Sequence, residues 1–104
     1  ARQCLPVTGG SVYQFAAQVL VPEQQGQGSA GLQVIFYSKQ GCTEHAIDQV
    51  MSNFIAPGSD WEVVERNERA PNQAGSAMLR LVVIKPFRSP PFKAHFDNVL
   101  ARGP

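Results

Sequence analysis

Residues 12–21 read VYQFAAQVLV, and apolar and polar side chains alternate along them. Successive side chains of a β-strand point to opposite faces of the sheet, so this alternation predicts a strand with one buried face. The side chains expected in the core are Tyr13, Phe15, Ala17, Val19 and Val21. A turn at residues 8–11 precedes the strand, and a polar, Gly-rich loop at residues 22–31 follows it.

The same pattern recurs in five other stretches, each closed by a Gly-, Pro- or Asn-rich break. They are residues 3–7, 32–38, 61–66, 76–85 and 92–100. Pro6 indicates that the first is an edge strand or a strand end. None of these stretches shows a sustained helical period, so the sequence predicts an all-β fold, an antiparallel β-sandwich.

Residues 44–56 leave two alternatives open. Their apolar residues recur at spacings of three and four, which fits one or two helical turns. The neighbouring stretches all predict strands, which favours a loop that runs into a strand.

The composition narrows the classes of function. We expect residues 1–104 to form a single sandwich domain, with a fragment of a longer jelly roll as the alternative. Nine basic and eight acidic residues give a net charge of +1 without a Lys/Arg cluster, so we expect no nucleic-acid partner. No apolar run approaches the ~20 residues of a membrane span, so we expect no membrane partner. The chain starts at Ala1 without a basic-apolar leader, so any signal peptide is expected to be already removed.

The two cysteines, Cys4 and Cys42, do not form a metal-type pair separated by two residues. We expect them to form a disulfide, for which the chain-entropy model gives ~4 kcal/mol of stabilisation. Such a bond indicates an oxidising compartment, so we expect a secreted or extracytoplasmic protein. The alternative is a pair of buried free thiols in a cytosolic protein.

Four landmarks follow one another in the chain: the segment Gly10–Phe15, the pair Phe36-Tyr37, Trp61 at the start of a strand, and the final Phe96–Val99. Their order resembles the jelly-roll carbohydrate-binding modules of the cellulose- and xylan-binding type that accompany bacterial glycoside hydrolases. The resemblance covers roughly residues 3–100. It implies a jelly-roll-like sandwich. It also implies that Trp61 lies in the core, beside the apolar Val63 and Val64; the alternative is an aromatic platform on which a sugar stacks.

One departure from that family is an absent N-terminal section, which usually supplies a further strand and an early tryptophan. A sheet without that strand has an open edge, and open edges pair with other chains. A homodimer is therefore one expectation.

Sugar-binding modules place flat aromatic rings against sugar faces, and flanking amides and charged groups bond the hydroxyls. The resemblance therefore implies a carbohydrate partner and candidate binding residues. These are Tyr37, Gln33, Gln14, Arg80 and His95, with Gln18 beside them. The alternative is that Tyr37 only covers the sheet and that the glutamines form a solvated face. Asp97 matches the position of a structural calcium ligand in many such modules; the alternative is a carboxylate that bonds backbone amides.

No catalytic arrangement accompanies the pattern. No serine or cysteine lies in a G-x-S-x-G context. His45, His95 and Asp97 are of the residue types that form an acid–base set. Glu62, Glu65 and Glu68 crowd a single strand and loop, whereas glycosidase carboxylates face each other across a cleft. We therefore expect no enzyme, no catalytic residue, no cofactor and no metal. The sequence predicts a non-catalytic module that recognises a poly- or oligosaccharide on a sheet face or loop edge. The alternative is a structural or assembly β-sandwich that has no sugar ligand and pairs through its open edge.

Overall fold

The computed structural model describes residues 2–22, 28–58, 60–84 and 94–103, in which every regular element is a β-strand. The strands are β1 (Arg2–Pro6), β2 (Val12–Leu20), β3 (Ser29–Tyr37), β4 (Ala46–Met51), β5 (Glu62–Arg69), β6 (Ser76–Ile84) and β7 (His95–Arg102). The all-β prediction is confirmed, and β4 resolves the open question at residues 44–56 in favour of a strand. Residues 92–93, expected to begin the last strand, lie outside the described residues.

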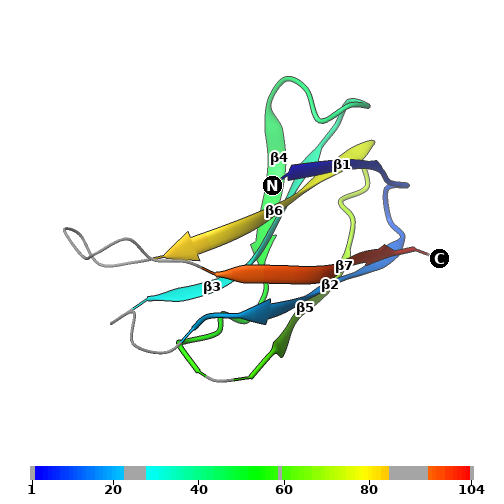
Figure 1. Cartoon of the computed structure of the whole chain (residues 1–104). Coiled ribbons are helices and arrows are strands. Elements are labelled where there is room, and N and C mark those ends of the chain that lie inside the picture. The colour runs from blue at the N-terminus through cyan, green and yellow to red at the C-terminus, as the bar shows by residue number, and fades with distance from the viewer. Residues whose placement is uncertain (1, 23–27, 59, 85–93, 104) are drawn as a thin grey trace.

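The strands form two antiparallel sheets that face each other as a sandwich (Figure 1). One sheet has the order β1-β6-β3-β4, and the other has the order β5-β2-β7. β1 is an edge strand, as Pro6 predicts. No helix in the described part of the chain is long and apolar enough to cross a membrane.

The core lies between the sheets and follows the predicted alternation of β2. Phe15 of β2 meets Phe36 of β3 edge to face, with ring centroids 6.4 Å apart, and this contact joins the two layers. Each sheet contributes one row of buried side chains: Phe15, Ala17, Val19 and Val64 from one, and Leu32, Val34, Phe36, Ala77 and Leu79 from the other. Tyr13 lies half-buried at the end of its row and stacks on Phe15.

The prediction that Trp61 lies in the core is wrong, because 45% of this residue is exposed. The cause is the register of β5. Val64 is fully buried opposite Ala17, so the inward row of β5 contains the even-numbered residues. Trp61 directly precedes the strand and belongs with the odd-numbered row, as does Val63, which is 53% exposed.

The predicted disulfide is present. Cys4 and Cys42 are bonded, with Cα atoms 6.1 Å apart. The bond joins the edge strand β1 to the turn at residues 38–45, which connects β3 to β4. It therefore ties together two segments that lie on either side of β6 in the sheet.

Candidate functional site

The outward side of the four-stranded sheet brings together three of the predicted carbohydrate-binding side chains. Leu32, Val34 and Phe36 of β3 are buried, so the alternate residues of β3 point away from the core. The strand registers place matching residues of β1, β4 and β6 beside them. We call this surface the four-strand face: Arg2, Cys4, Gln33, Ile35, Tyr37, Gln49, Met51, Ser76, Met78 and Arg80.

A hydrogen-bonded chain of polar groups crosses the four-strand face at Gln33, which is only 8% exposed. The Gln33 Nε2 donates to Gln49 Oε1 at 2.9 Å, and Arg80 Nη1 donates to Gln33 Oε1 at 3.2 Å. The chain joins β4, β3 and β6. A guanidinium has five N–H donors, so the single bond to Gln33 orients Arg80 and leaves donors for a ligand.

Tyr37 lies at the other end of the same strand face. It pairs with Ser76 of β6, and it lies four residues from Gln33, which corresponds to about 14 Å along a strand. Between them, Ile35 and Met78 pair across β3 and β6 and are half-buried. The four-strand face is therefore an elongated surface with an aromatic ring at one end, an apolar middle and a polar end, where the exposed Met51 pairs with Gln33.

The turn at residues 38–45 bounds the Tyr37 end of this surface. Ser76, fully buried, accepts a hydrogen bond from the Cys42 backbone N–H at 2.9 Å and donates to the Lys39 carbonyl at 2.5 Å. Cys42 and Glu44 have φ angles of 54° and 65°, a left-handed conformation that costs free energy in residues other than glycine. The disulfide and the Ser76 bonds hold the turn in this conformation against β6.

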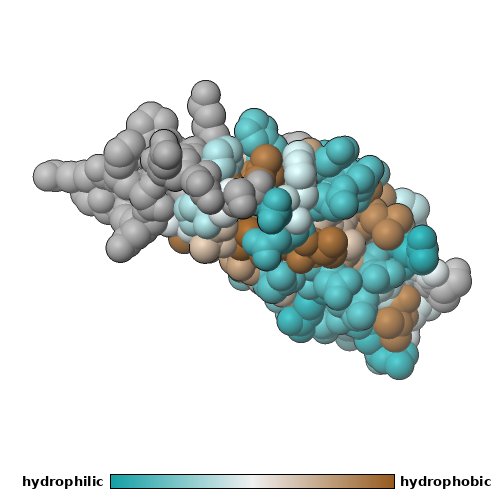
Figure 2. All heavy atoms as spheres, turned by 60° about the horizontal axis from the view of Figure 1, so that its bottom comes forward, coloured by the Kyte–Doolittle hydropathy of each residue, from teal (hydrophilic) through white to brown (hydrophobic). Residues whose placement is uncertain are grey.

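The structure separates the predicted residues into two groups. It brings Tyr37, Gln33 and Arg80 together on the four-strand face. Gln14 and His95 belong to the outward side of the other sheet, the three-strand face, where Gln14 pairs with Arg102 and His95 with Leu20. Figure 2 shows the molecule turned so that the bottom of Figure 1, where β5 lies, comes forward; most of the described surface there is hydrophilic.

Two polar residues of the four-strand face could not be placed there from the sequence. Gln49 lies in the stretch where the sequence fits helix or strand, and in the structure it pairs with Ile35. Arg2 lies just before the predicted first strand at residues 3–7, whereas in the structure it is the first residue of β1. Gln18, also considered from the sequence, lies on the three-strand face, where its Oε1 accepts a hydrogen bond from Asn98 Nδ2.

Asp97, His45 and His95, the candidates for a calcium ligand or an acid–base set, do not lie together in the structure. The Asp97 Oδ1 accepts a hydrogen bond from the Asn98 backbone N–H at 2.8 Å, which is the backbone role given as its alternative. His45 lies in the turn before β4, whereas His95 begins β7 in the other sheet. Within residues 2–22, 28–58, 60–84 and 94–103, no three His, Cys, Asp or Glu side chains gather into a group that could hold a metal ion.

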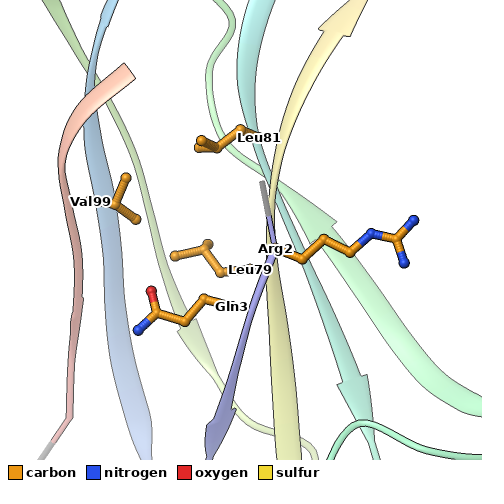
Figure 3. Close-up of a pocket in the computed structure, with 5 residues that line it drawn as sticks. All are labelled: Arg2, Gln3, Leu79, Leu81 and Val99. Atoms are coloured by element: carbon orange, nitrogen blue, oxygen red, sulfur yellow. The ribbon is translucent and has the colours of Figure 1, made fainter. Parts of the chain in front are cut away.

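An apolar pocket opens between the sheets on the side of β1 and β7. It is lined by Arg2, Gln3, Leu79, Leu81 and Val99. Figure 3 shows Gln3 and Leu79 directed toward Val99, whereas the Arg2 side chain extends the opposite way. The head group of Arg2 thus lies outside the inter-sheet space, on the side of the four-strand face.

The fold is similar to part of a solved xylanase structure. That structure holds the CBM22-1 and GH10 modules of the N-terminal endo-1,4-β-D-xylanase 10B of Clostridium thermocellum, complexed with xylohexaose. The match has a TM-score of 0.67 at 18% sequence identity, and it covers 93% of this chain and 17% of that chain. At this identity, the similarity establishes a common fold. No protein-family model and no curated protein matches the chain.

Proposed function

We propose that this chain binds a poly- or oligosaccharide without transforming it, and that the four-strand face is the binding surface. The observation that carries the proposal is the common position of Tyr37, Gln33 and Arg80, which come from two strands. An aromatic ring can cover the apolar C–H side of a sugar ring. Amide and guanidinium groups that are already oriented can then bond its hydroxyls.

The fold supports this proposal. The similar xylanase structure was solved as a complex with xylohexaose, which makes xylo-oligosaccharides the first ligands to test here. The disulfide fits a secreted or extracytoplasmic location, where such polymers occur and thiols oxidise. We propose that residues 1–104 act as one binding domain.

The test is calorimetric titration with xylohexaose, after a glycan array run with and without calcium. Tyr37→Ala should weaken binding about tenfold, as expected when about 1.4 kcal/mol of ring contact is lost. Trp61→Ala is the matched control, because Trp61 is an exposed aromatic residue outside the four-strand face. Its affinity should equal that of the unmodified protein.

Other outcomes are equally informative. Loss of binding in Trp61→Ala but not in Tyr37→Ala would move the site to the other sheet, where Gln14 and His95 lie. Calcium-dependent binding would support a role for Asp97 as a calcium ligand. A folded protein that binds no glycan on the array would contradict the proposed function.

The alternative, assembly through a sheet edge, has its own measurement. β1 and β7 are the edge strands on that side of the sandwich, where such pairing would occur. Size-exclusion chromatography with light scattering would show a concentration-independent homodimer if this reading were right.

A further inference from the structure

Two arginines lie side by side at the polar end of the four-strand face. Arg2 of β1 and Arg80 of β6 are directly opposed in the antiparallel register. Opposed residues have Cβ atoms about 4.5–5.5 Å apart, and like charges at such positions repel each other. The Arg2 side chain extends away from Gln3 and Val99 in Figure 3, so it is not directed into the inter-sheet pocket.

No carboxylate neutralises this pair among the residues that form the four-strand face. Asp48 of β4 aligns with Phe36 and so belongs to the inward-directed row, where its Oδ1 accepts from the Gln49 N–H. Glu44 lies in the turn at the opposite end, beyond Tyr37. The ion pair found in the described part of the chain, Arg66 with Glu68, lies on β5 in the other sheet.

We infer that the four-strand face selects saccharides that carry carboxylate groups, such as those with uronic acid units. This inference rests on the proposed function and names its ligand class. A carboxylate between Arg2 and Arg80 relieves their repulsion, and a guanidinium presents a planar fork that matches a carboxylate with two parallel hydrogen bonds. The Gln33 bond to Arg80 orients that fork before the ligand arrives.

The distance to Tyr37 sets a second requirement. The ring lies about 14 Å along the strand from the level of Arg80, so both contacts need an oligosaccharide rather than a single sugar. A ligand that stacks on Tyr37 with a neutral unit and presents an acidic unit to the two arginines uses the whole surface. A monosaccharide acid uses only one end and binds weakly.

The experiment compares three ligands on the intact, oxidised protein: xylohexaose, a xylo-oligosaccharide of similar length with a glucuronic acid branch, and dextran sulfate as a probe of unspecific charge attraction. We expect the branched acid to bind about tenfold more tightly than xylohexaose at low ionic strength, and added salt to reduce that ratio. Arg2→Gln and Arg80→Gln should each reduce the ratio. Arg80→Lys should retain part of it, because the charge remains and the fork is lost.

Arg102→Gln is the matched control, because it removes the same charge from the three-strand face. It should leave the ratio unchanged. An equal loss in Arg102→Gln and Arg2→Gln, or dextran sulfate binding as tightly as the acidic sugar, would overturn the inference in favour of net charge. Equal affinity for the neutral and acidic oligosaccharides would overturn the inference and leave the proposed function intact. Absence of binding to both oligosaccharides would overturn the inference, and absence of binding to every glycan on the array would overturn the proposed function as well.

Discussion

Gly9 occupies a position where two backbone segments meet too closely for a side chain. A Cβ atom there would overlap the carbonyl oxygen of Asn72. The two segments are also joined by hydrogen bonds, from Gly10 N–H to the Ala70 carbonyl at 2.9 Å and from Ala70 N–H to the Ser11 carbonyl at 2.8 Å. One missing side chain therefore allows the β1–β2 and β5–β6 connections to close one end of the sandwich.

Gly9→Ala should lower the free energy of unfolding by about 1–3 kcal/mol, because backbone atoms must move to admit the methyl group. Gly58→Ala is the control, since a Cβ there would have its nearest neighbour at 4.0 Å. Its effect should stay within about 0.5 kcal/mol. Urea unfolding of both variants checks the prediction, and equal stabilities would show that the two connections do not need this close approach.

The disulfide makes one turn and one edge strand interdependent. Breaking it should destabilise the protein by ~4 kcal/mol, the chain-entropy value for the separation of 38 residues between Cys4 and Cys42. A Cys4→Ala/Cys42→Ala double variant should match the reduced protein in urea unfolding and should not respond to reductant. If reductant leaves the stability of the unmodified protein unchanged, the bond contributes nothing to its folding.

Strand identity followed from the sequence where alternation was unambiguous, as in β2, but pairing partners did not. Alternate residues of a strand share one face, which is enough to put Gln33 and Tyr37 on the same face of β3. No local sequence pattern shows that β6 pairs with β3 and so places Arg80 beside them. The prediction misses that Gln14 and His95 belong to the other sheet for the same reason: alternation shows which residues of a strand share a face, but not which sheet the strand joins. In β5, adjacent Val63 and Val64 fit either face, so alternation alone does not correct the core position that the family resemblance implies for Trp61.

The whole molecule is built from pairings between strands far apart in the chain. β1 pairs with β6, and β2 pairs with β7, so both sheets need long loops to close before their hydrogen bonds form. Topologies of this kind fold on a scale of about milliseconds to seconds. The disulfide already holds Cys4 near the β3–β4 turn, so it removes part of the loop-closure cost.

We therefore expect refolding in about milliseconds to seconds, faster for the oxidised than for the reduced chain. Stopped-flow far-ultraviolet circular dichroism is the suitable probe, because the single tryptophan is 45% exposed in the folded state and its emission changes little. Refolding in microseconds, or identical rates for the two redox states, would contradict this account of the topology.

The position of Cys4 also determines how the molecule responds to mechanical load. A pull on the chain at Arg2 can peel an edge strand from its sheet one hydrogen bond at a time, as a zipper opens. Here the peeling ends after Arg2 and Gln3, because at Cys4 the tension passes through a covalent bond to the β3–β4 turn. The bond closes the segment between Cys4 and Cys42 into a loop that a pull between the chain ends does not extend, so β3, which carries Gln33 and Tyr37 of the proposed binding surface, bears none of that load.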